Sequence, residues 1–391
     1  MHAKDTWEQQ WQAALENRRR QGRYRELIGR RSKLEFDFLT NDYLGLANDP
    51  AIQHAIVEQI ERNELAFGAS GSRLLGGNRH LHQELEQTAA RFHKAEAGLL
   101  FPSGYQANLG LLATLADRHT TYIADEFIHA SLREGIRLSS AKHFRFRHNN
   151  LEDLEAKLKR AQNPSLVITE AVFSMDGDSP ALGNIARLCE QYGAGLVVDE
   201  AHSAGILGPH GAGLCVAQGI HQLPLARIVT FGKAFGSAGA IVLGSENLID
   251  FLRNFSRPFI YSTAPPPAMV VAILQAYRLM PEIENKRKPL YRNKTQLENW
   301  LNDLVSGQEE RLKLHSGKAA ILSLQTGSEA TARQLEQTLL TAGFGVRSVL
   351  PPTVPEGAAR IRFCLHSYNS LTAINSLGAA LFAFFDAEQA S

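Results

Sequence analysis

The feature that most constrains the fold is a regular alternation of apolar and mixed segments between about residues 95 and 245. Runs of about four to eight apolar residues are separated by segments with the spacing of amphipathic helices. The apolar runs read AGLLF, TYIAD, SLVITEAVF, AGLVVDEAH and ARIVTFGK. Strands of a parallel sheet are covered by helices on both faces, so they read as nearly continuous apolar runs. The pattern predicts an α/β fold with a mostly parallel central sheet and helices on both faces.

The chain has 391 residues, which is more than one compact core usually supports. The stretch STAPPPA near residue 265 interrupts the alternation, because consecutive prolines cannot lie inside a helix or a central strand. A charged helical stretch and a smaller set of strands and helices follow it. We therefore predict an N-terminal segment, 1–45, that packs on the body, a large α/β domain, 46–267, and a small α+β domain, 268–391.

The N-terminal segment has the spacing of an amphipathic helix, with Trp7, Trp11, Ala14 and Leu15 on one face. It is charged throughout and lacks the apolar core of a signal peptide. No apolar run of the chain approaches the ~18 residues that a membrane-spanning helix needs. We expect no membrane partner.

Charge and cysteine content narrow the class of partner. The 41 basic residues nearly balance 40 acidic residues, and a net charge of +1 gives no electrostatic basis for binding nucleic acid. Small molecules are the expected partners. Cys189, Cys215 and Cys364 are scattered and form no CxxC pair, so neither a disulfide framework nor a zinc site is expected. These features favour a reducing, cytoplasmic location.

Lys233 is isolated among small residues in IVTFGKAFGSAGA, residues 228–240. Such a lysine either extends to solvent or has a functional role. In open α/β sheets, ligands bind beyond the carboxyl ends of the strands, so the polar residues there are candidates for a site. These candidates are Asp125, Ser174, Asp199, His202, Thr230 and Lys233.

The segment VVDEAH contains the four letters of the helicase DEAH box at positions 199–202. A nucleotide-driven motor also needs an upstream phosphate loop of the form GxxxxGK[ST], whose amides and lysine bind the phosphates. The chain contains no such loop, and Lys233 lies downstream of Asp199. The sequence therefore excludes a helicase motor.

Asp199 and Lys233 instead suit pyridoxal 5′-phosphate (PLP). This cofactor withdraws electrons only while its ring nitrogen is protonated, and a buried carboxylate such as Asp199 keeps it so. A desolvated lysine forms a Schiff base with its aldehyde, which explains the small apolar neighbours of Lys233. About one βα unit separates the two residues, so they can lie at neighbouring strand ends.

The phosphate of such a cofactor needs an anion site. In FPSGYQAN, residues 101–108, a strand leads into a helix whose first amides are free, and Gly104 permits close approach of the backbone. Thr230 would add a hydroxyl. An ordinary helix cap at Ser103 explains the same motif equally well. His129 also opens a helix after a strand, where it either stacks on a planar cofactor or has a structural role.

Several motifs together resemble the α-oxoamine synthases, a family of fold type I PLP-dependent enzymes. They are NDYLGL, SGYQANLGLL, EAVFSMDGDSPAL, VVDEAH and VTFGKAFG. The resemblance extends from residue 41 to residue 363. IYSTAPPPA and PPTVPEGAARIR are most similar to the members of this family that act in biotin biosynthesis.

The resemblance implies a role for each matching residue. Lys233 would carry the cofactor and act as the base, Asp199 would pair with the ring nitrogen, and His129 would stack on the ring. Cofactor contacts are also implied for Gly104, Tyr105, Ser174, His202, Thr230 and Ser262, the last from the partner subunit of a homodimer. Catalytic roles are implied for Lys233, His129, Asp199 and His202. Substrate contacts are implied for Arg25, Asn41, Thr353 and Arg362.

The implied reaction is a decarboxylative condensation of L-alanine with pimeloyl-CoA or a pimeloyl-carrier protein. Another α-oxoamine synthase, such as a glycine C-acetyltransferase, and a cofactor-free scaffold on the same fold are the alternatives. Leu350 stands where the biotin-pathway members often have an arginine. Arg347 is a candidate to replace that arginine.

Overall fold

The computed structural model describes residues 3–25, 34–62, 65–161 and 164–389 and divides into two compact units, Met1–Glu35 and Phe36–Ser391. In the first unit, α1 (Ala3–Arg20) is the helix expected near the N-terminus. The rings of Trp7 and Trp11 lie 6.3 Å apart, and each side chain is more than half exposed. The packing of this segment on the body stays a prediction.

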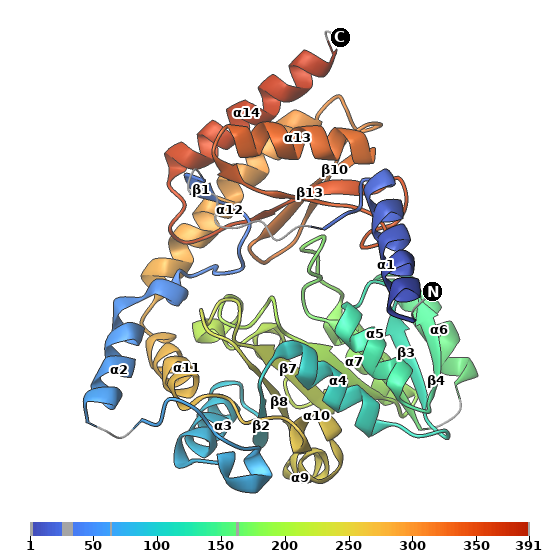
Figure 1. The fold of residues 1–391 in the computed structure, drawn as a ribbon. Coiled ribbons are helices and arrows are strands. Elements are labelled where there is room, and N and C mark those ends of the chain that lie inside the picture. The colour runs from blue at the N-terminus through green and yellow to red at the C-terminus, as the bar shows by residue number, and fades with distance from the viewer. Residues whose placement is uncertain (1–2, 26–33, 63–64, 162–163, 390–391) are drawn as a thin grey trace. The chain divides into compact units, whose positions relative to one another are not determined.

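A seven-stranded sheet is the centre of the second unit (Figure 1). Its order is β2-β8-β7-β6-β5-β3-β4, and β8 is the strand that runs antiparallel to its neighbours. The strands are β2 (Ala97–Phe101), β3 (Thr121–Asp125), β4 (Lys142–Phe146), β5 (Ser165–Glu170), β6 (Gly195–Asp199), β7 (Ala226–Thr230) and β8 (Ala240–Gly244). The mostly parallel α/β sheet is therefore confirmed, and β2 and β3 coincide with the runs AGLLF and TYIAD.

The apolar alternation did not identify β4 or β8. The β4 sequence KHFRF is mostly polar, because β4 is an edge strand whose side chains from Lys142 to Arg145 are exposed. The β8 sequence AIVLG is apolar, but it closely follows the small-residue loop after Lys233 and is antiparallel to β7. Neither strand fits the pattern of a buried parallel strand followed by a helix.

Helices cover both faces of this sheet and create two apolar cores. Neighbouring residues of one strand enter different cores: in β6, Val197 belongs to one cluster and Val198 to the other. This division follows from the alternation of side chains along a strand. The covering helices include α3 (His80–Phe92), α4 (Gly104–Leu115), α5 (Ala130–Leu138), α6 (Leu151–Arg160), α7 (Leu182–Gln191) and α9 (Glu246–Phe255).

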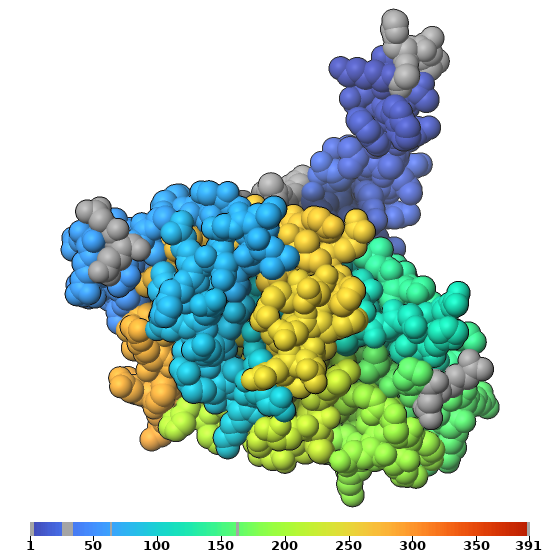
Figure 2. All heavy atoms as spheres, turned by 90° about the horizontal axis from the view of Figure 1, so that it is seen from below, coloured from blue at the N-terminus to red at the C-terminus, as the bar shows by residue number. Residues whose placement is uncertain are grey.

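One face of the unit brings distant segments together. The loop before α3 lies beside the segment that contains α9 and α10 (Arg257–Ile260) (Figure 2). Ser72 and Thr263 form an isolated β-bridge there, and the Ala264 amide donates to the Gly71 carbonyl. The glycine-containing loop is thereby fixed to the segment that precedes the proline triplet.

The C-terminal part contains a second, antiparallel sheet in the order β12-β13-β10-β9. Its strands are β9 (Lys313–Ser316), β10 (Ile321–Gly327), β12 (Arg347–Val349) and β13 (Ala359–Cys364). Its helices are α12 (Glu284–Val305), α13 (Glu329–Thr341) and α14 (Leu371–Gln389). Preceding this part, α11 (Pro267–Leu279) begins at the last proline of the triplet, in agreement with the predicted break.

The segment before α2 (Pro50–Glu61) joins this C-terminal part. The short strands β1 (Phe36–Asp37) and β11 (Phe344–Gly345) pair in parallel, and the Cys364 amide donates to the Phe38 carbonyl. The predicted domain boundaries stay a prediction. Within the described residues, no helix combines the length and the apolar character needed to cross a bilayer.

Asn293 of α12 provides a test of how the C-terminal part is held. Its buried side-chain amide donates to the carbonyls of His366 and Asn369, at 2.9 and 2.7 Å. We expect Asn293→Ala to lower the free energy of unfolding by about 2–4 kcal/mol, because two buried carbonyls lose their donor. Urea unfolding measures this loss. The exposed Asn302→Ala on the same helix should stay within ~0.5 kcal/mol of wild type, and equal losses in both variants would contradict the assignment.

Candidate active site

A cavity of about 340 Å³ opens at the carboxyl ends of the parallel strands. The loops after β2, β3, β6 and β7 and the last residue of β5 supply most of its lining. Eight of the residues singled out from the sequence line it: Asn41, Gly104, Tyr105, His129, Asp199, His202, Thr230 and Lys233. The position agrees with the rule that open α/β sheets bind ligands at this edge.

Lys233 is held by a neutral imidazole. Its Nζ lies 2.7 Å from Nε2 of His202, and Nδ1 of His202 lies 2.7 Å from the hydroxyl of Tyr43. That hydroxyl donates to Oδ1 of Asn41 at 3.0 Å, so Nδ1 of His202 donates to the tyrosine oxygen and Nε2 accepts from Lys233. Burial and the positive charges of Lys233 and Arg362 hold the pKa of His202 well below its usual range. A neutral acceptor therefore orients the lysine.

The environment of Lys233 also favours loss of its proton. Burial lowers the pKa of Lys233 to about 8, although the carboxylates of Asp199 and Glu170 oppose this shift. An amine is nucleophilic only without its proton. A substantial fraction of Lys233 is therefore reactive near neutral pH.

Asp199 ends β6 as a buried, fully oriented carboxylate. Its Oδ1 accepts from the Ala201 amide at 2.9 Å, and its Oδ2 accepts from Nδ2 of Asn108 at 2.9 Å. Asn108 also donates to Oγ of Ser131 at 3.0 Å, and that oxygen lies 2.7 Å from Nδ1 of His129. One network thus orients both the carboxylate and the imidazole that line the cavity.

His129 both caps a helix and lines the cavity. It is the N-cap of α5, where its Nδ1 accepts from the Ser131 amide at 3.2 Å. Its own amide donates to Oε1 of Glu170 at 2.5 Å. Burial lowers the pKa of His129, against the opposing charge of Asp199, so the neutral ring is favoured.

Glu170 is a buried acid in the cavity wall. It pairs in register with Asp199 on the neighbouring strand, and burial together with that carboxylate raises the pKa of Glu170 to about 8. The protonated form is therefore favoured at neutral pH. One of the two adjacent carboxyl groups can then stay neutral while the other carries charge.

The start of α4 supplies the features of an anion site. Ser103 caps the helix by accepting from the Gln106 amide, while the first amides of a helix have no partner within it. Oγ1 of Thr230 is buried and has no hydrogen-bond partner among the residues that the structure describes. A Cβ atom at Gly104 would lie 2.7 Å from the methyl carbon of Thr230, so only glycine permits this approach. Both interpretations of the motif, helix cap and anion site, therefore fit.

Arg362 approaches the cavity from the C-terminal sheet. Its Nη2 donates to Oδ1 of Asn41 at 3.0 Å, and its Nε donates to the Ser174 carbonyl at 2.7 Å. Ser174 contacts the site through this carbonyl and does not line the cavity. The guanidinium is thus oriented by two neutral acceptors, which leaves its charge available to a carboxylate.

Other residues singled out from the sequence lie elsewhere. Ser262 accepts from Nε2 of Gln106 at 3.2 Å within its own chain, so its contact across a dimer stays a prediction. Thr353 is exposed in a turn, and Arg25, in the first unit, is also exposed. Arg347 pairs with Glu336 at 3.3 Å and does not line the cavity.

Asp125 ends a strand but does not line this cavity. It accepts from the amides of Phe127 and Asn149 and contacts His148. Strand ends alone are therefore an incomplete guide to the site, because neighbouring side chains of a strand point in opposite directions.

The site residues that were not singled out from the sequence include Tyr43, Asn108, Ser131 and Glu170. Tyr43, Asn108 and Glu170 lie inside motifs that the resemblance used. Their partners are distant in sequence, so only the fold shows the contacts.

Comparison with known proteins identifies the family. Residues 35–375 match the family model described as aminotransferase class I and II. The chain belongs to this family. An 8-amino-7-oxononanoate synthase from Chromohalobacter salexigens is 38% identical, with 95% of each chain covered. One from Acidithiobacillus ferrooxidans is 37% identical, with 96% of this chain and 98% of the relative covered.

Solved structures agree with this placement in the aminotransferase family. A serine palmitoyltransferase from S. paucimobilis with bound PLP is 30% identical with a TM-score of 0.84, covering 91% of this chain and 88% of that one. An 8-amino-7-oxononanoate synthase from Francisella tularensis is 31% identical with a TM-score of 0.77, covering 90% and 98%. The resemblance, the fold type I architecture and the PLP cofactor are thereby confirmed.

The residues of the cavity fit PLP. The unpartnered Thr230 hydroxyl and the start of α4 suit its phosphate, and the buried Asp199 suits its ring nitrogen. Lys233, with its lowered pKa, suits its aldehyde. The chain thus supplies a group for the phosphate, for the ring nitrogen and for the aldehyde of the cofactor.

The Thr230 hydroxyl offers a direct test of the phosphate site. Thr230→Val removes a hydroxyl that has no hydrogen-bond partner within the described part of the chain, so the cofactor-free fold should keep its stability. We expect PLP affinity to fall by about 10-fold or more, because a hydrogen bond to a charged group is lost. Fluorescence titration of the cofactor-free protein measures the affinity. Thr230→Ser should bind within about 3-fold of wild type, whereas wild-type affinity in Thr230→Val would place the phosphate elsewhere.

The lowered pKa of Lys233 predicts a pH dependence. Below a pKa of about 8, the unprotonated fraction of the amine falls ~10-fold for each pH unit. The rate at which cofactor-free protein gains the visible absorption band after mixing with PLP should fall accordingly and should level off above pH 8. Stopped-flow absorption measures this rate, and Lys233→Arg should give no such band. A midpoint near the ordinary lysine pKa would contradict the assigned environment.

Proposed function

We propose that this enzyme condenses L-alanine with a pimeloyl thioester to give 8-amino-7-oxononanoate, releasing carbon dioxide and the thiol. The thioester is pimeloyl-CoA or a pimeloyl-carrier protein. The observation that carries the proposal is the position of Lys233 between a neutral His202 and the buried Asp199 in a cavity that Arg362 approaches. The choice of alanine and of the pimeloyl group is supported by the names of the relatives.

When bound, PLP supplies an electron sink that stabilises negative charge at the Cα atom of an amino acid. Asp199 would hold the proton on the ring nitrogen, while Thr230 and the first amides of α4 would hold the phosphate. His129 would lie against the ring face. These groups are fixed before the reaction by the Asn108 and Ser131 contacts, so little reorganisation is needed.

Arg362 and Asn41 would bind the carboxylate of the amino acid. The guanidinium provides charge and paired N–H donors, and Asn41 holds it at the cavity edge. Lys233 would take the Cα proton on Nζ and return it later. His202 steadies that amine without donating a proton to it, because its Nε2 is an acceptor.

The proposal also includes a homodimer in the cytoplasm, with Ser262 of one subunit reaching the phosphate of the other. The relatives do not decide the amino acid, since the serine palmitoyltransferase structures have TM-scores as high as 0.84. A different α-oxoamine synthase is therefore the alternative. The acyl contacts of Arg25 and Thr353, and the replacement of the arginine missing at Leu350 by Arg347, belong to this proposal as well.

One assay separates the two candidates. Purified holoenzyme is given L-alanine, glycine or L-serine with pimeloyl-CoA, acetyl-CoA or palmitoyl-CoA, and the released thiol is measured. We expect kcat/KM for L-alanine with pimeloyl-CoA to exceed every other pair by at least about 10-fold, because one methyl group in a fitted pocket contributes about that factor.

Visible spectra of the same protein provide the control. The cofactor band should change on addition of L-alanine and change again only when the thioester is added. A response to glycine but not to alanine would move the assignment to a sister enzyme. No cofactor band after addition of PLP would contradict the role of Lys233.

A further inference from the structure

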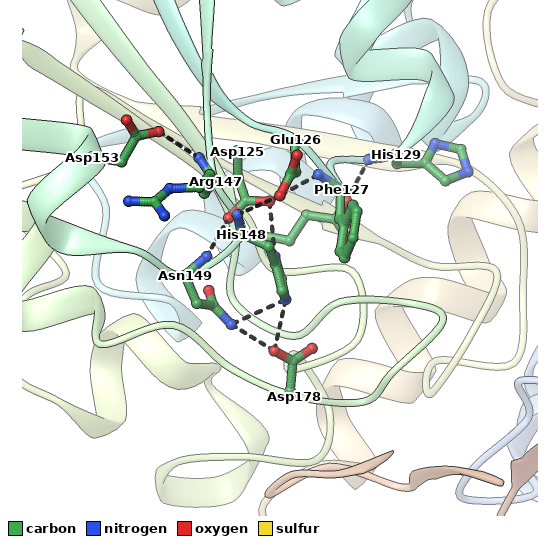
Figure 3. A network of polar contacts seen from close by, with 10 residues as sticks. Asp125, Glu126, Phe127, His129, Arg147, His148, Asn149, Asp153 and Asp178 are labelled. Atoms are coloured by element: carbon green, nitrogen blue, oxygen red, sulfur yellow. Dashed lines mark hydrogen bonds and ion pairs between the residues drawn. The ribbon is translucent and has the colours of Figure 1, made fainter. Parts of the chain in front are cut away.

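A second polar network lies beside the active site, at the ends of β3 and β4. Figure 3 shows His148 between the carboxylates of Asp125 and Asp178, with Asn149 next to it. Nδ1 of His148 lies 2.9 Å from Oδ1 of Asp125, and Nε2 lies 2.9 Å from Oδ2 of Asp178. Nδ2 of Asn149 also lies 3.1 Å from Nε2. A neutral imidazole can donate from one nitrogen, so donation to both carboxylates needs the doubly protonated ring.

Two phenylalanine rings pack against the same imidazole. The ring centroid of Phe127 lies 4.6 Å away, and that of Phe173 lies 4.4 Å away at nearly a right angle. Burial disfavours the charged form, but the contacts with Asp125 and Asp178 outweigh it and raise the pKa of His148 to about 9. The ring is therefore a fixed cation at neutral pH.

Asp178 belongs to a closed loop. The Phe173 amide donates to the Asp178 carbonyl at 2.9 Å, and the Gly177 amide donates to the Phe173 carbonyl at 2.8 Å. Asn149 Nδ2 also donates to the Asp178 carboxylate, at 2.5 Å. The loop 173–178 is thus attached to the ends of β3 and β4 through the Asp178 carboxylate and through the packing of Phe173 on His148.

The other side of this loop contacts the C-terminal sheet. The Ser174 carbonyl accepts from Nε of Arg362 at 2.7 Å, and Asp176 forms an ion pair with Arg360. Gly177 has a φ of +72°, and a Cβ there would lie 2.4 Å from the Ile321 carbonyl oxygen. The loop cannot shift without moving the acceptor of Arg362.

We propose that His148 is a positioning residue for amino acid binding: it clamps the loop 173–178 so that the Ser174 carbonyl holds Arg362 in the orientation that receives the substrate carboxylate. His148 itself does not touch the substrate. The inference rests on the proposed role of Arg362. In this proposal, carboxylate recognition depends on a series of contacts that starts at His148, beside the central sheet, and passes through the loop 173–178 to Arg362.

The charged groups around His148 define its pH response. Asp125 and Glu126 face it from the end of β3, the latter accepting from the His148 amide at 2.9 Å, and Asp178 faces it from the loop. His315 of β9 lies within electrostatic reach and 3.6 Å from Asp176; burial is the largest cause that lowers the pKa of His315, and the charge of His148 adds to it. Loss of the His148 proton would remove one of the two carboxylate contacts and loosen the clamp.

The test compares binding of L-alanine with binding of ethylamine, which is alanine without its carboxylate. Both are titrated into the PLP-loaded enzyme, and the change in the cofactor band gives each dissociation constant. We expect His148→Gln to weaken L-alanine binding by about 10-fold and ethylamine binding by less than about 2-fold. The exposed His143→Gln on β4 is the matched control and should change neither.

A double-mutant cycle with Arg362→Gln shows whether the effect passes through the arginine. In that background, His148→Gln should change L-alanine affinity by less than about 2-fold. The ratio of the L-alanine dissociation constants of His148→Gln and wild type should also shrink as the pH rises through about 9, because wild-type His148 then loses its proton. A purely structural role would not produce this pH dependence. If His148→Gln does not fold, Asp178→Asn replaces it in the test. Asp178→Asn keeps the shape of the loop and should also weaken L-alanine binding.

Equal weakening of alanine and ethylamine, or equal effects in both backgrounds, would overturn the proposal. Unchanged alanine affinity in His148→Gln would overturn it too. If wild type gives no spectral response to L-alanine, the proposed function fails instead. The same cycle is then run with glycine or L-serine, which carry the same carboxylate.

Discussion

The arrangement of the site depends on one contact, the hydrogen bond between Lys233 and a neutral His202. A lysine that must lose its proton near neutral pH cannot have a carboxylate as its direct partner, because the ion pair would keep it charged. Here the direct partner is an imidazole acceptor at 2.7 Å, whereas Asp199 acts on the lysine only through its longer-range charge and Glu170 favours its neutral form near neutral pH. The lysine is thus oriented without being held as a cation.

This contact in turn requires the parallel sheet. His202 follows β6 and Lys233 follows β7, and these strands are neighbours that run in the same direction. Their carboxyl ends therefore meet at one edge, where short loops bring the two side chains together. The same edge collects the helix start after β2 and the N-cap of α5 after β3. An antiparallel arrangement of β6 and β7 would place these residues at opposite ends of the sheet.

Sequence reasoning found residues that line the cavity where one segment carried its own signal. Lys233 among small residues, Asp199 at the end of a valine run and Gly104 at a helix start each have a local chemical meaning. It could not identify Asn108, whose amide meets Asp199 across 91 positions, or Tyr43, which meets His202 across 159. An asparagine inside a helix and a tyrosine in a loop have many ordinary roles. Their function comes from partners that only the fold supplies.

The same limit applies to the strands. The strands AGLLF and TYIAD could be delimited from the sequence because both of their faces are buried, and strands buried on both faces are nearly continuous apolar runs. KHFRF could not, because an edge strand exposes most of its side chains and need not be apolar. Its pairing with β3 nonetheless places His148 beside Asp125.

The segment from Phe36 to Leu46 joins the two halves of the site. Its β1 pairs with β11, and its backbone accepts from the Cys364 amide at Phe38 and from the Ser367 amide at Tyr43, so it is fixed to the C-terminal part. Its side chains contact residues of the active site. Tyr43 contacts His202, and Asn41 accepts from both Tyr43 and Arg362. A continuous chain of hydrogen bonds therefore runs from Lys233 to Arg362, and the distance between the proposed base and the proposed carboxylate-binding group is set by a short loop of fixed geometry. An amino acid whose carboxylate binds at one end of that chain would present its Cα atom at the other, which is the condition for a single lysine to remove and return the same proton.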